Sequence, residues 1–496
     1  MLNRFRSNPE RALRRAPHLH ATLQIDRNAL RARYNGQLVY DLLEKDIVFA
    51  LENQILTNKW HRVLWGCLPH RIKRLLRRKS TSRRTMTSIH GKVLFVASIE
   101  NNLNSMLPAA RALKARGIEA CFLVKAAFMR TIARSKKDVQ GLRFVGFDDI
   151  PILPSESVKA ALRIWNQDLQ VICSVLADSG YTRTQCFAFT TFARRMAEAH
   201  LGATEWLVYQ FQATAPLCVV APRPKSRLVV APVIAARAAG IETIFMAHTS
   251  WFRELGDLFK LYDLSCFDSA IVYSNLCAAD VRRRNSDTSI YVSGWPQLSQ
   301  EPPFSNERHG SLIVGYPCNR QYDFLQDLAK VVNEVGGCFL VKGHPPGNDK
   351  EHIARHLESF NNVVLWDHNE ISLREFFASI DVLVCGKSNV GVEASSLGVP
   401  TISLYTDAEE AVTQVRRRSV EARDVALWSV SDLTELRDLL SRIAHQSRAS
   451  LAIYAKQQAE KCETIFPKYD SALVADFIID RASGIRPVSD QPMTLP

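Results

Sequence analysis

The chain has 496 residues, of which 47% are hydrophobic and 23% charged, which is enough apolar material for more than one core. No stretch approaches the ~20 consecutive apolar residues of a membrane-spanning helix, and the first thirty residues lack the apolar region of a secretory signal. The eleven cysteines are scattered singly, without a CxxC pair, which argues against a zinc site or a disulfide framework and indicates buried thiols in a reducing cytoplasm.

The net charge of +13 lies in the first ninety residues. Residues 1–90 hold 19 Lys and Arg against 6 Asp and Glu, and the remainder is neutral with 44 of each sign. We expect a basic, mainly helical extension that contacts an anionic membrane surface, because Ile72, Leu75 and Leu76 share one helical face among the basic residues of 71–84. A solvated basic helix or mobile tail is the alternative. Nucleic acid is not expected, since no zinc-finger, RNP or helix-turn-helix signature accompanies the charge.

A first strand–helix series follows the extension. Residues 90–98 form a short apolar run that predicts a buried strand, 107–117 predict a helix with a proline near its start, and 118–124 predict the next strand. This β-α-β unit implies a parallel sheet. The pattern recurs as a strand at 227–233, a helix at 234–240, and strands at 242–247, 267–274 and 289–296. These elements predict a Rossmann-like domain over 91–298.

A polar linker with a proline pair, residues 299–310, separates this series from a second one. The second series predicts strands at 311–316, 338–341, 363–366, 382–385 and 400–405 and helices at 322–335, 351–359, 372–378, 390–397 and 433–463. We therefore expect a second Rossmann-like domain over 311–465 and a helix and tail over 466–496. The predicted fold class is α/β, with two doubly wound domains that bind ligands at the carboxyl ends of their strands.

Lys342 and His344 follow the second strand of this second domain, in the sequence LVKGHPPG. Lysine and histidine suit phosphate oxygens, as a charge and as a hydrogen-bond donor, and Gly343 permits a close approach of the backbone. The two prolines at 345 and 346 fix the loop. The alternative is a structural turn with a surface lysine and a capping histidine.

The segment GKSNVGVEASSLGVP, residues 386–400, follows a strand directly. Ser388 or Asn389 should cap the next helix, and a helix start at a strand end is an anion site. A capping box would need an acid at 391 or 392, where Gly and Val stand. Glu393 is therefore expected to accept hydrogen bonds from ribose hydroxyls. The alternative for Glu393 is a favourable carboxylate–dipole contact.

His248 leaves an apolar strand of the first domain and is the candidate general base, although a histidine there can also serve the structure alone. Three further strand ends carry polar residues. The loop 100–102 is a weaker candidate, Arg320 is a candidate phosphate ligand or a surface arginine, and the loop 366–370 lies where a nucleobase could rest against backbone.

The order of four motifs over 91–465 resembles the GT-B glycosyltransferases of bacterial surface-polysaccharide synthesis. The motifs are MAHT at His248, VSGWP at Gly294, VKGHP at His344 and SNVGVEASSLGVP from Ser388. The last two are similar to those of cytidine-nucleotide transferases, namely bacterial sialyl- and Kdo-transferases and CDP-glycerol glycerophosphotransferases. The resemblance implies that His344 and Ser388 contact the donor phosphate and that His248 is the acceptor-side base.

Two positions depart from the family pattern. Its His-Gly pair is His248-Thr249 here, and the acidic pair Asp148-Asp149 is followed by isoleucine in place of the glycine found in bacterial sialyltransferases. Sialic acid is therefore not singled out as the donor sugar.

The resemblance implies a metal-independent, inverting transferase that uses a nucleotide sugar as co-substrate and no further cofactor. Lys342, His344 and the helix start at Ser388 would neutralise the donor phosphates. The acceptor would be a glycan or a lipid-linked sugar of capsule or lipopolysaccharide synthesis, and the enzyme would be cytoplasmic and peripheral to the inner membrane. Two alternatives stay open: a UDP-sugar 2-epimerase of the same fold, and a non-catalytic glycan- or membrane-binding scaffold.

Overall fold

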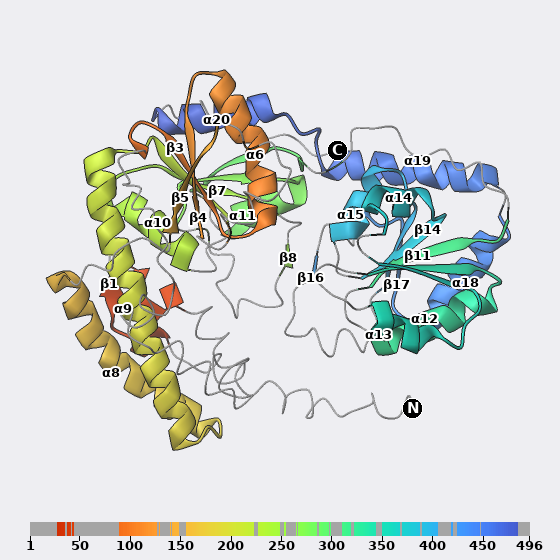
Figure 1. Cartoon of the computed structure of the whole chain (residues 1–496), viewed down its shortest axis with the longest axis horizontal. Coiled ribbons are helices and arrows are strands. Elements are labelled where there is room, and N and C mark those ends of the chain that lie inside the picture. Colours follow the sequence, from red (N-terminus) through yellow and green to blue (C-terminus); the bar gives the residue numbers. More distant parts are fainter. Residues whose placement is uncertain are drawn as a thin grey trace.

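The computed structural model of the 496-residue chain is shown in Figure 1. It describes residues 27–34, 37–40, 42–43, 89–125, 128, 139, 141–147, 155–222, 227–248, 252–253, 264, 266–284, 287–296, 298, 310–318, 322–343, 350–367, 370–386, 389–404, 418–419, 424–446 and 448–484. Most of the predicted basic extension lies outside these residues. So do the predicted linker, apart from Gly310, and the tail after Gly484.

The first domain is built on a parallel sheet with the strand order β10-β9-β7-β6-β3-β4-β5. Its strands are β3 (Val93–Ala97), β4 (Ala120–Val124), β5 (Arg143–Gly146), β6 (Cys218–Ala221), β7 (Thr243–Met246), β9 (Ser269–Val272) and β10 (Ser289–Val292). The central strands are apolar and wholly buried, as parallel strands are when helices cover both faces of the sheet. The first β-α-β crossover is the one that the sequence predicted.

Two predicted elements of this domain are corrected by the structure. The helix expected from residue 107 begins earlier, since α6 spans Glu100–Ala115 and contains Pro108 in its interior. The strand expected at 227–233 is wrong, because α10 (Arg227–Ala238) is helical throughout this run. A short apolar run can belong either to a buried strand or to a buried helix, and its composition does not distinguish the two. The strand in this part of the chain is β6, which lies just before α10.

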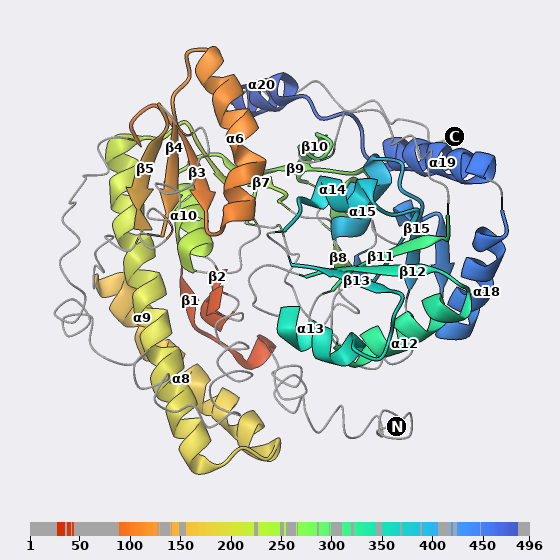
Figure 2. The same ribbon diagram turned by 45° about the vertical axis from the view of Figure 1, so that its right-hand side comes forward.

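A long helical hairpin is inserted between β5 and β6. It consists of α8 (Glu156–Asp178) and α9 (Arg183–Thr214), and it extends away from the sheet in both ribbon views (Figures 1 and 2). These helices were not predicted from the sequence. Their caps are Ser155, which accepts a hydrogen bond from the Val158 amide, and Thr182, which forms a capping box with Gln185.

Part of the N-terminal extension packs on this hairpin. The short strands β1 (Arg33–Tyr34) and β2 (Gln37–Leu38) pair antiparallel, and the preceding turn is the 3-10 helix η2 (Arg27–Ala29). The buried carboxylate of Asp168 on α8 accepts hydrogen bonds from the Arg31 amide at 2.9 Å and the Ala32 amide at 2.7 Å. The extension thus holds a β-hairpin within the segment that was expected to be mainly helical.

The second domain has the strand order β13-β12-β11-β14-β15-β17, again with parallel neighbours. Its strands are β11 (Ile313–Pro317), β12 (Cys338–Lys342), β13 (Val363–Trp366), β14 (Val382–Cys385), β15 (Thr401–Leu404) and β17 (Trp428–Val430). Its helices are α12 (Tyr322–Glu334), α13 (Lys350–Leu357), α14 (Leu373–Ala378), α15 (Asn389–Ser396), α18 (Leu433–Ala444) and α19 (Arg448–Ile465). The strand order of a Rossmann fold is present in both sheets, so the predicted fold class is confirmed.

The chain links the two domains a second time near its C-terminus. After α19 it crosses back, and α20 (Ser471–Ala482) packs beside α6 on the first sheet (Figures 1 and 2). A further backbone link is the antiparallel pair of β8 (Phe252–Arg253) with β16 (Arg418–Ser419). None of the described helices combines the length and apolar character that crossing a bilayer requires.

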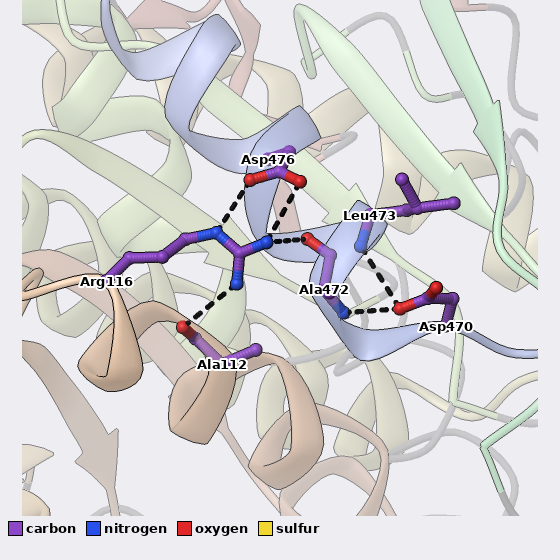
Figure 3. A network of polar contacts seen from close by, with 6 residues as sticks. All are labelled: Ala112, Arg116, Asp470, Ala472, Leu473 and Asp476. Atoms are coloured by element: carbon purple, nitrogen blue, oxygen red, sulfur yellow. Dashed lines mark hydrogen bonds and ion pairs between the residues drawn. The ribbon is translucent and has the colours of Figure 1, made fainter.

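Ion pairs fix α20 to the first domain, as Figure 3 shows for Arg116. Its guanidinium donates to both carboxylate oxygens of Asp476, at 2.7 and 2.9 Å, and to the Ala472 carbonyl at 3.0 Å. At the other end of the helix, Arg481 donates to Glu242 at 2.9 Å. Bidentate and charge-assisted bonds of this kind give geometric specificity as well as energy.

The crossover passes over the motif Gly294-Trp295. Gly294 has a φ of +73°, and a Cβ at this position would clash with the Pro467 carbonyl and lie 2.9 Å from the Tyr469 amide. The Trp295 ring stacks on Tyr273 with centroids 5.6 Å apart. One of the four motifs behind the family resemblance therefore has a structural role, because it lets the returning chain approach the end of β10.

Candidate functional site

The candidate site lies at the carboxyl edge of the second sheet, at its topological switch point. In the order β13-β12-β11-β14-β15-β17 the switch falls between β11, which ends at Pro317, and β14, which ends at Cys385. Open α/β sheets bind ligands in the crevice that forms at such a point. The helix that leaves this point is α15 (Asn389–Ser396), which agrees with the predicted helix 390–397 to within one residue. Ser388 and the side chain of Asn389 lie outside the described residues.

A glycine brings the start of α15 close to the sheet. An added Cβ on Gly391 would lie 2.6 Å from the Cys385 sulfur, so with any larger residue either the Cys385 side chain or the helix would have to shift. The Ser395 hydroxyl donates to the Gly391 carbonyl at 2.7 Å within the same buried face. The helix start, with its amide groups and positive dipole end, is thereby fixed against the end of β14.

Glu393 lies on α15 and is half-buried. Burial raises the pKa of its carboxyl group from 4.5 to about 7. The alternative of a favourable dipole contact for Glu393 stays open beside the expected role toward ribose hydroxyls. A carboxyl group with this pKa can accept, and near neutral pH also donate, hydrogen bonds to hydroxyl groups.

Lys342 is the last residue of β12 and is only 7% exposed. Its backbone is in register with Pro317 on one side and Trp366 on the other. Its Nζ donates to the Ile371 carbonyl at 2.6 Å. Burial lowers the pKa of the ammonium group, against the opposing effect of nearby carboxylates, first among them Asp367. The surface lysine of the alternative interpretation is therefore excluded, and the ammonium engages the protein's own backbone.

The described residues of the loop after β13, where a base was expected to rest, form several hydrogen bonds. Glu370 accepts from the Asp367 amide at 2.7 Å and forms an ion pair with Lys350. Ser372 and Glu375 form a capping box at the start of α14, in which the Glu375 carboxylate accepts from the Ser372 amide at 2.6 Å. These partners were missed in the sequence analysis, although S-x-x-E before an apolar run is a readable signal for the capping box.

The remaining predicted donor residues lie outside the described part of the chain. His344 and Arg320 belong to this group, together with Ser388, and their proximity to Lys342 stays a prediction. Within the described residues, no group of three or more His, Cys, Asp and Glu side chains is placed to hold a metal ion. Metal independence likewise stays a prediction.

The candidates of the first domain lie at the carboxyl edge of the other sheet. His248 is half-buried and follows β7 by two residues, as expected for a residue that leaves a strand end. Residues 100–102, expected as a polar loop, form the first turn of α6. The Asn102 side chain accepts hydrogen bonds from the Ser98 amide at 3.0 Å and the Ile99 amide at 3.2 Å, so it closes the turn between β3 and α6.

Comparison with known proteins gives likenesses of fold only. No protein-family model matches the sequence, and no curated protein does. The solved structures similar to it include CalG4, the calicheamicin glycosyltransferase, with 12% identity, a TM-score of 0.47 and coverage of 80% of this chain and 99% of that one. MurG from Acinetobacter baumannii has 12% identity, a TM-score of 0.46 and coverage of 78% and 99%. UDP-GlcNAc 2-epimerase from Neisseria meningitidis, bound to UDP-GlcNAc, has 13% identity and a TM-score of 0.46, and the match covers 79% of this chain and 100% of that one. At these values the likenesses carry no information about substrate.

Proposed function

We propose that this chain is a glycosyltransferase that moves a sugar, or a glycerol-phosphate-like group, from a nucleotide-activated donor to a glycan or lipid-linked acceptor. One observation carries the proposal. The helix α15 begins at Asn389 at the switch point of the second sheet, Gly391 brings it against β14, and Glu393 lies about one turn after the helix start. A helix start in this position favours a phosphate group, and a partly protonated carboxyl group beside it favours a sugar hydroxyl.

The donor would lie across the carboxyl edge of the second sheet. Its phosphates would meet the start of α15 at Ser388 and Asn389, with His344 and Arg320 as further donors. The ribose hydroxyls would bond to Glu393, and the base would lie against the loop that follows β13. Preorganised donors of this kind stabilise the negative charge that develops on the leaving nucleotide without a metal ion.

His248 would act from the first domain as the general base. In this step the imidazole takes the proton of the acceptor hydroxyl, whose oxygen bonds to the anomeric carbon while the bond from that carbon to the nucleotide phosphate breaks. Attack from the side opposite the leaving group inverts the configuration. This role is supported by the position of His248, which is half-buried and follows the end of β7 by two residues.

The finer assignments follow the motif resemblance. We propose a cytidine nucleotide as the donor's activating group, an acceptor of capsule or lipopolysaccharide type, and a location at the cytoplasmic face of the inner membrane. The first ninety residues carry a net charge of +13, which suits an anionic lipid surface. The described part of this extension, the hairpin of β1 and β2, is anchored to α8 through Asp168, and it would place the basic segment beside the first domain.

The test is a calorimetric titration of CMP, CDP and UDP into the full-length protein and two variants, His344→Ala and Ser388→Ala. Each variant should weaken the binding of the preferred nucleotide by about tenfold or more, because each removes a hydrogen bond to a charged phosphate. The matched controls are His445→Ala at the end of α18 and Ser174→Ala on the exposed side of α8. Unchanged binding in both site variants would refute the site.

The two alternatives have their own outcomes. Formation of an epimer from UDP-GlcNAc without any acceptor would show a 2-epimerase in place of a transferase. Absence of binding by all three nucleotides would favour a glycan- or membrane-binding scaffold.

A further inference from the structure

The side chain of Lys342 is used inside the second domain. The residue ends β12, its neighbour Gly343 donates from its amide to the Trp366 carbonyl at 2.9 Å, and its own Nζ donates to the Ile371 carbonyl at 2.6 Å. Both bonds reach the same target, which is the end of β13 and the loop that follows it. The Gly343 backbone and the Lys342 side chain together therefore hold Trp366 and Ile371, on either side of this loop.

An ammonium group at this buried position has an energetic cost. Only 7% of Lys342 is exposed, and burial lowers the pKa of its Nζ. Asp367, Glu370 and Glu375 offset part of this cost by their charge. An apolar side chain would fill the same space without desolvating a charge. Unlike an apolar side chain, lysine also supplies a hydrogen-bond donor that reaches the Ile371 carbonyl oxygen.

The same loop is held at two further points. Glu370 accepts from the Asp367 amide at 2.7 Å and pairs with Lys350 of α13. Ser372 and Glu375 cap α14 reciprocally. The described residues of this loop, 366–367 and 370–372, are thus held at three points at the carboxyl edge of the sheet. Recognition of a base by backbone groups depends on such prior fixing, because the groups must already stand in the binding geometry.

We propose that Lys342 is a positioning residue for the nucleobase: it holds the Ile371 carbonyl, and with it the described ends of the loop after β13 (366–367 and 370–371), in the position that receives the base, and it does not bind the donor phosphates. This inference rests on the proposed function of the same site. It changes the role expected from the Lys-Gly-His pattern, in which lysine and histidine were one phosphate-binding pair. His344 and the start of α15 remain the phosphate ligands, and Lys342 contributes to base specificity.

The number of phosphates on the ligand separates the two roles. We would titrate cytidine, CMP, CDP and UDP into the wild type and Lys342→Met by calorimetry. If Lys342 positions the loop, the variant should bind the nucleoside, the monophosphate and the diphosphate with the same loss of affinity, about tenfold. It also predicts that the affinity ratio between CDP and UDP moves toward one. If Lys342 instead binds phosphate, cytidine binding should be unchanged and the loss of affinity should grow with each phosphate on the ligand. This result would overturn the inference.

Matched variants separate positioning from a general loss of stability. Lys330→Met makes the same chemical change on the exposed side of α12 and should leave all four affinities unchanged. Glu370→Gln weakens a different support of the same loop and should also reduce the discrimination between CDP and UDP. Lys342→Arg keeps the positive charge but displaces the donor, so positioning predicts reduced discrimination here too. A phosphate role predicts that Arg preserves binding, and this variant decides the question if the methionine variant does not fold.

Amide hydrogen exchange, measured without nucleotide, tests whether Lys342 holds the loop independently of any ligand. The amides of a peptide covering 363–376 should exchange faster in Lys342→Met than in the wild type, with no change in Lys330→Met. Equal exchange in both would overturn the inference even if nucleotide affinity fell. If the wild type bound none of the four ligands, the proposed function and the base-positioning role would fail together, and faster exchange would then assign Lys342 to loop structure alone.

Discussion

The two sheets share one strand order but differ in what covers them. The first sheet is closed by segments from distant parts of the sequence: α20 comes from the C-terminal end of the chain, and the inserted hairpin of α8 and α9 carries the N-terminal strands. The second sheet is covered mainly by helices from its own strand–helix alternation. The contrast suggests that long-range contacts mainly stabilise the first domain, whereas local motifs at the carboxyl edge of the second build the site.

Two glycines show the same contrast. Gly294 makes room for the backbone of a segment that is distant in the sequence, near Pro467, whereas Gly391 makes room for Cys385, only six residues away. Both belong to motifs that resemble those of one enzyme family. The first motif serves the path of the chain between domains, and the second serves a helix start at a candidate ligand site.

The largest effect is expected from Gly294→Ala. The new methyl group would clash with the Pro467 carbonyl at a residue whose φ is +73°, so we expect a loss of about 3 kcal/mol or more in the free energy of unfolding. Urea denaturation measures it. Gly91→Ala is the control, because its φ is +64° but no atom lies within 4 Å of the added carbon, and its cost should be about 1 kcal/mol. Equal losses of stability in the two variants would show that the backbone near Pro467 does not closely approach Gly294.

A smaller loss should follow the removal of the Arg481 charge. Arg481 and Glu242 are 14% and 20% exposed, and Glu242 also accepts from the Ser269 hydroxyl at 2.7 Å. Arg481→Met leaves this carboxylate without its cation and should cost about 2 kcal/mol. The exposed pair of Lys159 with Glu156 provides the control, since Lys159→Met should leave the free energy of unfolding nearly unchanged. If α20 did not stabilise the first domain, both variants would have the same free energy of unfolding as the wild type.

Asp168→Asn tests the anchoring of the N-terminal segment. Its carboxylate accepts from the Arg31 and Ala32 amides, and an amide group would turn one acceptor into a donor, at a cost of about 1–2 kcal/mol. Limited proteolysis should release residues before β1 faster in this variant. Asp178→Asn at the exposed end of α8 should leave the cleavage rate unchanged, and an equal rate for Asp168→Asn would contradict the anchoring.

The smallest effect concerns Glu393 and depends on pH. Its folded-state pKa of about 7 exceeds the reference value of 4.5, so its contribution to stability is fully present below pH 4.5 and is lost as the pH rises through 7. Because the group is half-buried, we expect a loss on the order of 1 kcal/mol. Glu393→Gln should remove this part of the pH dependence, as measured by urea denaturation between pH 4.5 and pH 8. Parallel pH profiles for wild type and variant would contradict the shifted pKa.

Sequence patterns predicted the parts of this fold that depend on neighbouring residues. Buried apolar runs marked most strands, and the helix predicted at 390–397 is α15 (Asn389–Ser396). The run 227–233 was misassigned because a buried helix and a buried strand share one composition. The caps of α8 and α9, at Ser155 and Thr182, were readable signals that went unused.

The tertiary roles of particular residues could not be predicted in this way. The partner of Gly294 lies near Pro467, and no local pattern shows that contact. Lys342 stands in a strand-end motif typical of phosphate binding, and only the position of the Ile371 carbonyl shows where its ammonium is directed. A motif thus indicates which residues matter at a strand end, while the distant contacts decide what each of them does.

The central claim is that the carboxyl edge of the second sheet binds the nucleotide of an activated donor. Calorimetric titration of CMP, CDP and UDP into the full-length protein tests it most directly, with the double variant His344→Ala and Ser388→Ala measured in parallel. The account predicts one saturable site in the wild type, with a preference for a cytidine nucleotide, and loss of that binding in the double variant. Equal binding by the wild type and a correctly folded double variant, or none by the wild type, would contradict it.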